Sequence, residues 1–365
     1  MYRLQSCWFT IQRSLFPALE DELGPLSDTE ERFVRVVAVI DIGPWMLPFR
    51  WKFTGRKPED RHAILKAFLA KAVWNFPTTR ALLDYLHSAP SLRRLCGWDR
   101  AADIPSEATF SRAFAAFASG ELPQQLHAAM IHTHLGPKLI GHISRDATAI
   151  PAREHPAPKP PPPPPAPKKK RGRPAKDDPP RPPKPPTRVM LQPTRSLAEN
   201  LADLPTACNV GCKRNSQGYQ ESWTGYKLHL DCADGDIPVS ALLTSASLHD
   251  SQVAIPLAQL TAGRVHNLYD LADSAYDVPQ ILAFSHSLGH VPLIDPHPRR
   301  ADALPFDPAS KIRFRERSTV ERVNSNLKDN FGGLVVRVRG HAKVMAHLLF
   351  GLLALTATQL FTLLL

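Results

Sequence analysis

Three carboxylates in different parts of the chain could share one metal site if the fold brings them together. They are Asp146 in HISRDATAI (142–150), Asp273 in LADSAYD and Glu321 in STVERVNSNLKD. Clustered carboxylate oxygens suit Mg²⁺ or Mn²⁺, and phosphate chemistry uses two such ions to clamp the attacking and leaving oxygens. Four other acids are alternatives, and the most serious is Asp270, which lies on the same expected strand as Asp273; the others are Asp250, Asp295 and Glu316.

The segment around Glu321 predicts a helix from about 317 to 330 with two distinct faces. Its apolar stripe, which we expect to face the core, consists of Val320, Val323 and Leu327. At 100° per residue the adjoining polar face gathers four side chains within about 60°: Arg317, Glu321, Asn324 and Lys328. A carboxylate flanked by two cations suits a phosphate backbone that passes over a metal ion. The alternative is an ordinary exposed face with charge pairs at i,i+4 and i,i+7 spacing.

The elements that must position these residues begin beyond residue 140. HISRDATAI predicts a first strand. GYKLHLDCA (225–233) and DIPVSALLTSA (236–246) alternate apolar and polar residues as strands do, and the Asp-Gly pair between them is a hairpin-type turn. After these the pattern predicts alternating helices and strands, at about 251–263 (helix), 266–273 (strand), 278–288 (helix), 290–295 (strand) and 317–330 (helix).

An antiparallel opening followed by strand–helix alternation predicts an α/β domain over 140–345, with a mixed sheet and helices packed on its faces. The order of elements resembles the ribonuclease H-like fold. In that topology the first and fourth strands are neighbours, so we expect Asp146 and Asp273 to meet near the carboxyl ends of strands, where ligands gather. Acids at strand ends are also common caps and turn residues, which is the alternative interpretation of both.

Residues 1–135 are expected to form a mostly helical domain. Apolar residues recur at helical spacing in 60–75, 78–89 and 106–118, and Ser106 is placed as an N-cap. A helix–turn–helix fits the last of these segments, and a helical bundle used for packing or dimerisation fits equally well. The prediction is therefore a domain for DNA binding, dimerisation or both.

Positive charge is concentrated in one proline-rich stretch. The chain of 365 residues carries a net charge of +11, and residues 156–186 hold nine Lys or Arg against two Asp, together with 16 prolines. Such prolines favour extended, unpaired backbone, so we expect disorder over at least 156–190. The stretch belongs to an insertion at 151–224, which interrupts the α/β domain rather than linking two domains.

The centre of this insertion, Arg171-Gly172-Arg173-Pro174, resembles the AT-hook, a short arm that binds the minor groove of DNA. Both arginines would suit a narrow A·T-rich groove, whose negative potential attracts arginine. The preceding cations would bind phosphates without regard to sequence: Lys168, Lys169 and Lys170. A solvated basic insertion with only weak charge attraction is the alternative.

The cysteines and the two ends of the chain favour a cytoplasmic protein. Five scattered cysteines do not form a disulfide framework, and the N-terminus lacks the pattern of a signal peptide. The last 18 residues carry no charge and are long enough to cross a membrane, yet they include three Thr and a Gln. We expect a buried C-terminal helix over 346–365, packed on the α/β domain, and no membrane partner.

The motifs around the acids resemble the DDE transposases of bacterial insertion sequences. The last-helix signature of that family is an aromatic followed at fixed spacing by Arg, Glu and Lys, and it matches Phe314, Arg317, Glu321 and Lys328, with Phe in place of the usual Tyr. RDATAIPARE is similar to the first-Asp strand of the family, ADSAYD to its second-Asp motif, and the helical N-terminal region to its N-terminal domain. The resemblance covers roughly residues 45–355.

The resemblance implies an enzyme that cuts phosphodiester bonds at transposon ends and joins the freed 3′-hydroxyls to target DNA. Asp146, Asp273 and Glu321 would hold two Mg²⁺ or Mn²⁺ ions. The partner would be double-stranded DNA, bound by a homodimer because two ends must be brought together. The cations expected to contact DNA near the acids are Arg317, Lys328, Arg337 and Arg339.

Two other functions are compatible with the sequence. One is a catalytically inactive or domesticated DNA-binding protein, against which the presence of all three acids argues. The other is a metal-dependent nuclease without strand transfer, which the sequence separates poorly from a transposase.

Overall fold

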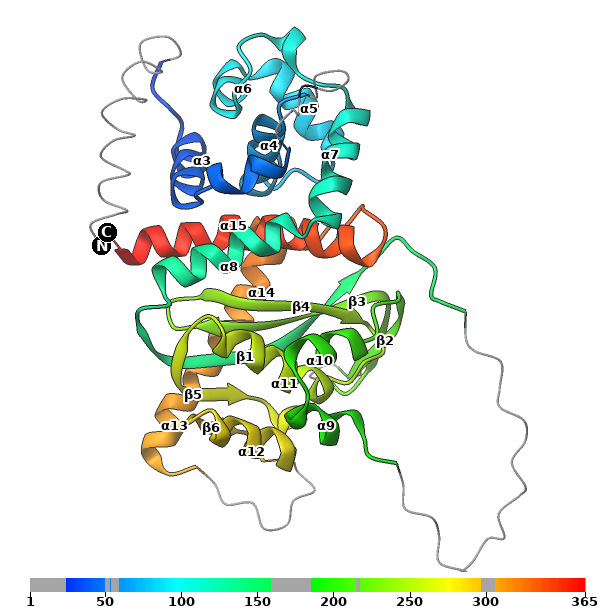
Figure 1. The fold of residues 1–365 in the computed structure, drawn as a ribbon, viewed down its shortest axis with the longest axis vertical. Helices are drawn as coiled ribbons and strands as arrows, with labels where there is room; N and C mark the ends of the chain where they lie inside the picture. The colour runs from blue at the N-terminus through cyan, green and yellow to red at the C-terminus, as the bar shows by residue number, and fades with distance from the viewer. Residues whose placement is uncertain are drawn as a thin grey trace, which may run out of the picture.

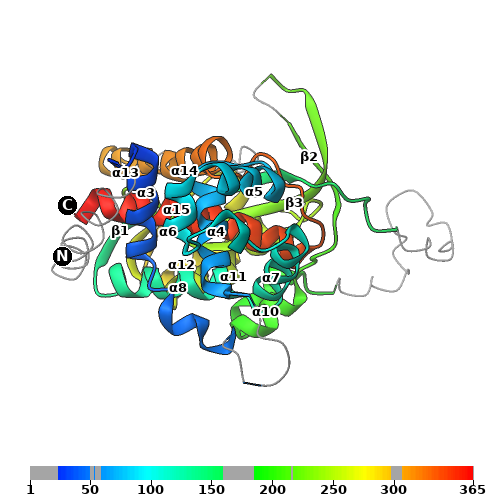
Figure 2. The same cartoon turned by 90° about the horizontal axis from the view of Figure 1, so that it is seen from above.

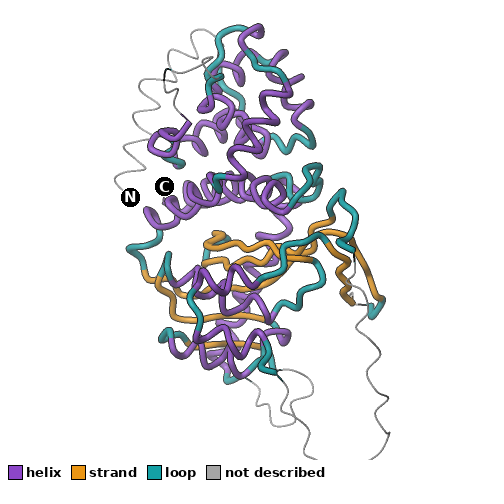
Figure 3. Tube along the Cα trace, turned by 45° about the vertical axis from the view of Figure 1, so that its right-hand side comes forward, coloured by secondary structure: helices purple, strands orange, loops and turns teal. Residues whose placement is uncertain are grey.

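The computed structural model describes residues 24–49, 53, 59–158, 185–214, 217–296 and 306–364. The first part of the described chain is helical, and Figures 1 and 3 show its helices stacked above the sheet. The predicted helices at 60–75, 78–89 and 106–118 are confirmed. The elements of this part are α3 (Asp28–Val39), η1 (Gly43–Phe49), α4 (Arg61–Val73), α5 (Thr79–Ser88), α6 (Pro90–Cys96), η2 (Ala101–Asp103), α7 (Glu107–Ser119) and α8 (Leu122–His134), where η denotes a 3₁₀ helix.

Local capping explains where several of these helices begin. Ser27 and Glu30 form a capping box before α3, in which the Glu30 carboxylate accepts the Ser27 backbone N–H at 2.9 Å. The side chains of Asp60 and Thr78 accept backbone N–H groups at 2.8 and 3.0 Å and so cap α4 and α5. Ser106 takes the predicted N-cap position of α7, although its hydroxyl does not cap the helix.

A six-stranded mixed sheet forms the second part of the molecule, and five of its strands are those that the sequence predicts. The strand order is β2-β3-β1-β5-β6, and β4 pairs with β3; β1 runs antiparallel to β3 and parallel to β5. This is the neighbourhood of the first and fourth strands that the ribonuclease H-like fold requires. The strands are β1 (Leu139–Pro151), β2 (Asn209–Arg214), β3 (Gln220–Ala233), β4 (Ile237–Ser245), β5 (His266–Ala272) and β6 (Val291–Ile294).

Helices cover both faces of this sheet. Because side chains alternate along a strand, Ser144 and Asp146 of β1 share one face and Arg145 lies on the other. The Ser144 hydroxyl donates to the Glu316 backbone oxygen at 2.9 Å, so the first face lies under η5 and α14. The second face packs against α11, whose Thr261 donates to Asp231 of β3 at 2.7 Å. The elements are α11 (Ser251–Ala262), η4 (Ser274–Tyr276), α12 (Pro279–Ser287), α13 (Pro308–Phe314), η5 (Arg315–Arg317) and α14 (Ser318–Asn330).

The C-terminal helix α15 (His341–Leu364) lies between the upper helices and the sheet (Figure 1). It contacts α3, α4, α7 and α8 of the helical part, and also β4 and α14. Within the described residues it is the one helix long and apolar enough to cross a membrane, and 83% of its apolar window is buried. The predicted buried helix is therefore confirmed, and it packs on the helical part as well as on the α/β domain.

The insertion between β1 and β3 is more ordered than the sequence predicts. Disorder was expected up to residue 190, whereas the structure describes the chain from residue 185 and α9 begins at Arg188. Polar side chains hold this part: Asn200 is fully buried and its Nδ2 donates to the Gln192 backbone oxygen at 3.0 Å and to the Gln259 side chain at 2.9 Å. The elements are α9 (Arg188–Leu191), η3 (Gln192–Thr194), α10 (Leu197–Asp203) and the unpredicted strand β2.

The strand β2 forms a hairpin with the first half of β3, and Figure 2 shows this hairpin extending away from the body of the sheet. Its pairing runs from Asn209 opposite Gly225 to Arg214 opposite Gln220. β3 is consequently longer than the predicted strand 225–233. The rest of the insertion, residues 159–184, lies outside the described residues, as do the basic arm and its arginines.

Candidate active site

Asp146 lies at the centre of the sheet, on the strand between β3 and β5. Asp146 is paired with Leu230 of β3. Its side chain points to the same face of the sheet as Ser144, which is the face below η5 and α14. Its pKa is raised to about 7, first by burial and then by the nearby carboxylates of Asp273 and Asp250, while the Ala147 backbone N–H and the charge of Arg317 oppose the rise. The surroundings of Asp146 therefore favour the protonated form of its carboxyl group up to about pH 7.

Asp273 directly follows β5 and lies beside Asp146. The parallel register places Ser144 opposite Leu271, so two residues further on Asp146 and Asp273 are level. The Asp273 carboxylate caps η4 by accepting the Ala275 backbone N–H at 2.9 Å. Burial raises the pKa of Asp273, and Asp250 raises it further. The two acids therefore meet at the sheet position that the topology predicts.

Asp250, one of the alternative acids, belongs to the same electrostatic cluster. Its charge raises the pKa of both Asp146 and Asp273. Its Oδ1 accepts a hydrogen bond from the Lys227 ammonium at 2.9 Å, and the ring of His229 lies 4.0 Å away. Asp250 thus stands next to the site and is paired with a cation of its own, Lys227.

Asp270, the most serious alternative to Asp273, takes part in a separate buried network. The Ser285 hydroxyl donates to its carboxylate at 2.6 Å, and the side chains of His290 and Asn267 lie at 3.1 and 3.0 Å. Burial opposes its ionisation, but the hydrogen bonds and the charge of Arg145 outweigh burial and lower its pKa. The hydrogen-bond partners of Asp270 are side chains of the protein, so Asp270 stabilises the packing of β5, α12 and β6.

The other two alternatives differ from each other. Asp295 follows β6 and raises the pKa of Asp273, so it borders the cluster. Glu316 is exposed, and only its backbone oxygen reaches the sheet, where it accepts the Ser144 hydroxyl.

The helix α14 presents the two faces that the sequence predicts. Its apolar stripe of Val320, Val323 and Leu327 is fully buried. Glu321 is on the polar face, where its side chain is 50% exposed and forms an ion pair with Arg317 at 2.7 Å. Among the residues that the structure describes, no three Asp, Glu, His or Cys side chains are close enough to hold a metal ion. The Glu321 carboxylate is thus turned toward Arg317 rather than toward Asp146 and Asp273.

Two cations flank the acids on this helix. The charge of Arg317 lowers the pKa of Asp146 and of Asp273, and its guanidinium lies 5.9 Å from the centre of the Phe314 ring. Near the C-terminal end of α14, the Lys328 ammonium donates a hydrogen bond to the hydroxyl of Thr148 on β1. The polar face of α14 therefore runs along β1, past Asp146, with a cation at each end.

Comparison with protein families gives two matches. The model described as the transposase DDE domain matches residues 138–357, and the model described as a transposase domain (DUF772) matches residues 21–116. The first match covers more than half of the chain, including all three acids and the helix α14. The chain belongs to the DDE transposase family. No curated protein and no solved structure matches it.

Membership of this family makes the protein a transposase of the polynucleotidyl-transferase kind, with a ribonuclease H-like fold and DNA as its substrate. The family generally uses divalent metal ions. The second match covers the helices from α3 through most of α7, so most of the helical part also corresponds to a transposase domain.

The chemistry of the acid cluster suits a divalent ion, although among the described residues no three such side chains are close enough to hold one as they stand. The charges of Asp273 and Asp250 raise the pKa of Asp146, and the charge of Asp250 also raises the pKa of Asp273; a bound cation would relieve this repulsion. Carboxylate oxygens are also the ligands that Mg²⁺ prefers. Rotation of the half-exposed Glu321 side chain away from Arg317 is the change that a third carboxylate ligand from α14 requires.

The remaining cations named from the sequence fall in two groups. Arg337 and Arg339 are exposed in the loop between α14 and α15, and the Gly340 backbone N–H anchors this loop by donating to Glu154 at 2.9 Å. The five cations of the basic arm lie outside the described residues: Lys168, Lys169, Lys170, Arg171 and Arg173.

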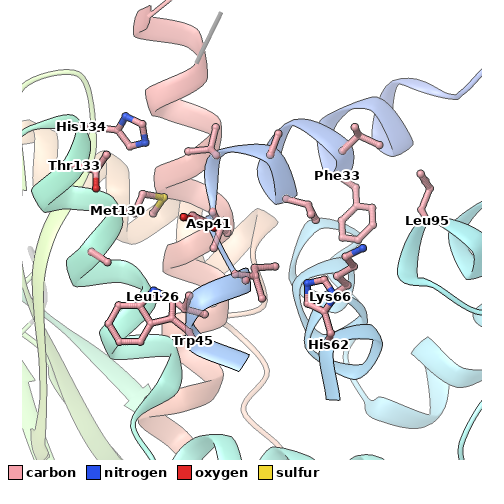
Figure 4. Close-up of a pocket in the computed structure, with 18 residues that line it drawn as sticks. Phe33, Asp41, Trp45, His62, Lys66, Leu95, Leu126, Met130, Thr133 and His134 are labelled. Carbon is pink, nitrogen blue, oxygen red and sulfur yellow. The ribbon is translucent and has the colours of Figure 1, made fainter. Parts of the chain in front are cut away.

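A cavity in the helical part of the transposase lies apart from the acids. It measures about 700 Å³ and is lined only by the helical part, from α3 and η1 to α4 and α8. In Figure 4 the side chains of His62 and Lys66 project into it from α4, opposite Met130 and Thr133 of α8. No residue of the sheet lines this cavity, so it has no direct place in the chemistry of the acids.

Two charged contacts near the acids were missed in the sequence. Behind Asp146, the fully buried Asp231 of β3 accepts two hydrogen bonds from Arg145, both at 2.7 Å. Beside it, Lys227 reaches Asp250 from β3. The signal was present for the first pair, since alternation puts Arg145 on the face opposite to Asp146, where it needs a buried partner.

Proposed function

We propose that this transposase cleaves phosphodiester bonds at transposon ends and joins the freed 3′-hydroxyls to target DNA. The observation that carries the proposal is the cluster of Asp146 and Asp273 at the junction of β1, β5 and α14, with the pKa of Asp146 raised to about 7. Perturbed acids at the carboxyl end of parallel strands are typical of catalytic sites. The family match supplies the substrate class.

We assign the metal-binding role to Asp146, Asp273 and Glu321. Two Mg²⁺ or Mn²⁺ ions, when bound, would activate the attacking oxygen and stabilise the leaving oxygen. Asp146 and Asp273 present their carboxylates from the rigid sheet, and Glu321 completes the set by leaving Arg317. That exchange leaves the guanidinium of Arg317 free for a DNA phosphate.

DNA would run along the polar face of α14. Arg317 and Lys328 stand at the two ends of this face and would each bind a backbone phosphate. Arg337 and Arg339 would extend the contact beyond the helix, and the basic arm would hold DNA beside the site because it leaves β1 a few residues after Asp146. The phosphate contacts of Arg317, Lys328, Arg337 and Arg339 would position DNA without reading its sequence.

We propose that the transposase acts as a homodimer on DNA. We also propose a role for each part of the chain. A helical domain at 1–135 binds DNA or mediates dimerisation, and a catalytic domain at 140–345 carries the acids, interrupted by the insertion 151–224. The helix over 346–365 completes the core between them. The dimer follows from the mechanism, since two transposon ends must be brought together.

Incubation of the protein with Mg²⁺ and DNA that carries the inverted repeats flanking its gene tests the proposal. We expect joined products from the wild type and none from Asp146→Asn or Asp273→Asn, whereas Asp329→Asn, an exposed acid near the end of α14, should leave joining intact. Cleavage without joined products would make the protein a nuclease. Binding without cleavage would make it an inactive DNA-binding protein.

A further inference from the structure

A cavity of about 260 Å³ lies where the helical part meets the end of α14. Its walls come from α4, α5, α7, α15 and the loop after α14. Next to it, the Asn75 side chain in the turn between α4 and α5 donates to the Asp329 backbone oxygen at 2.7 Å, which ties the two parts together. The apolar walls are aromatic: Phe68, Phe114, Phe331 and Phe350.

Lys71 of α4 enters this cavity without a partner. Among the described residues, no carboxylate and no hydrogen-bond acceptor contacts its ammonium group. Burial lowers the pKa of Lys71 to about 8, and the pKa of His347, which also lines the cavity, is lowered to about 3 by burial and by the charge of Lys71. Lys71 is half-buried, so its ammonium is partly desolvated and lacks a counter-charge, which is unfavourable in a folded protein. An anion from outside the chain would supply the missing counter-charge.

Other groups make the cavity favourable for an anion. Arg337 lines its rim, is exposed and has no ion-pair partner among the described residues. Thr78 and Thr79 bring the N-terminus of the ten-residue helix α5 to the wall, and helix N-termini attract anions. The single carboxylate of the lining, Glu107, is bound to Arg80 at 2.7 Å. The balance of charge in the lining is therefore positive.

We propose that this cavity binds a phosphate group of the DNA backbone between Lys71 and Arg337. The choice of DNA as the source of the phosphate rests on the proposed function. Arg337 belongs to the loop that follows α14, and the cations at the two ends of the polar face of α14 are those proposed to contact DNA. The cavity opens at the exposed residues Pro77, Glu107 and Arg337, so a backbone passing over α14 can reach it. A free phosphate ion has the same chemistry, and the test separates the two sources.

A bound phosphate at this place would join the helical part to the catalytic part. Lys71 comes from α4, and Arg337 comes from the segment after α14, so one phosphate would contact both. DNA binding would thus lock the two parts of the transposase against each other beside the polar face of α14.

The salt dependence of DNA binding tests the site with Lys71→Met, which removes the charge and keeps an apolar side chain of similar length. Binding to a short duplex is measured in the absence of divalent ions, so that nothing is cleaved. We expect the slope of log affinity against log salt to fall by about 0.9, the effect of one lost phosphate contact. The matched control is Lys66→Met, on the same helix but lining the other cavity; its slope should equal that of the wild type.

Amine labelling at pH 8, read by mass spectrometry, separates the two sources of phosphate. A bound anion favours the protonated amine, and a rise of one pKa unit from about 8 would slow the labelling of Lys71 about five-fold. Protection by the duplex alone supports a DNA phosphate, and protection by inorganic phosphate as well supports a site for either source. Unchanged labelling with both probes, together with a wild-type slope for Lys71→Met, would overturn the proposal.

A folding defect does not imitate this result. Because Lys71 has no partner to lose, Lys71→Met should unfold at a temperature no lower than the wild type. Failure of the proposed function can be distinguished from failure of the anion site. If the protein neither cleaves nor joins DNA and Lys71 is still protected from labelling, the anion site is supported and the transposition mechanism is refuted. If DNA is joined and Lys71→Met binds like the wild type, the anion site alone falls.

Discussion

Replacement of Asp146 by Asn should stabilise the metal-free protein at alkaline pH. The pKa of Asp146 is raised from 3.8 to about 7, so the folded state holds the proton more tightly than the unfolded state does. The folded protein therefore loses stability as the pH rises from about 4 to about 7, and the loss is complete above that range. Asn has nearly the same shape and carries no charge, so the variant escapes this loss.

The magnitude follows from the size of the pKa shift. At about 1.4 kcal/mol per pKa unit, a rise of about three units corresponds to roughly 4 kcal/mol at pH 8. Relaxation around the charge and entry of water reduce this value, and we expect a gain of about 2 kcal/mol in the free energy of unfolding. At pH 5.5 the gain should be roughly half as large, because the folded wild type is then mostly protonated.

Urea unfolding of wild type and Asp146→Asn, at pH 8 and pH 5.5, measures this difference. The control is Asp99→Asn, which alters an exposed acid and should change the stability little at either pH. Addition of Mg²⁺ at pH 8 should stabilise the wild type and leave Asp146→Asn unaffected. A variant that is less stable than the wild type at pH 8 would refute the reasoning, since it would show that the ionised carboxylate is stabilising.

Three further outcomes are expected. Asp270→Asn should lower the free energy of unfolding at pH 7 by about 3 kcal/mol. Because the pKa of Asp270 is lowered in the folded protein, this deficit should shrink as the pH falls below 3.8. Equal urea midpoints at pH 7 would show that the buried network does not depend on the charge of Asp270. Arg317→Gln and Lys328→Gln should each reduce the salt slope of DNA binding by about 0.9, and unchanged slopes would remove them from the DNA path. The double substitution of Arg171 and Arg173 by Ala should weaken DNA binding and reduce its salt slope; if both stay as in the wild type, the basic arm does not bind DNA.

Much of the fold was predictable because the hydrophobic pattern is strong where elements are buried. The helix at 317–330 buries one face, so helical spacing reveals it directly. The strand at 225–233 is buried on both faces, His229 and Asp231 included, yet its apolar residues still alternate along the sequence. The strand β2 and the helix α10 were not predictable in this way. The helix α10 is short and is held by polar contacts, such as the hydrogen bonds of Asn200 to Gln192 and Gln259, whereas β2 is held by backbone pairing with β3; neither leaves a periodic apolar signal.

The candidate site was predictable as far as topology determines it. Adjacent parallel strands bring Asp146 and Asp273 together whatever their side chains do. The ion pair of Glu321 with Arg317 depends on side-chain rotation on an exposed helix face, which the sequence does not specify. Likewise, Asp250 joins the cluster because Lys227 on β3 holds it there, a contact between residues 23 positions apart.

Iron(II) cleavage of the polypeptide tests most directly the claim that Asp146, Asp273 and Glu321 share a metal site. Fe²⁺ bound in place of Mg²⁺ generates radicals with ascorbate and peroxide, which cut the backbone next to the ion, and mass spectrometry locates the cuts. We predict cuts in three segments, β1 around Asp146, the end of β5 around Asp273 and α14 around Glu321, with all three suppressed by excess Mg²⁺. Cuts around Asp250 and Asp295 with none in α14 would contradict the assignment of Glu321 as the third ligand.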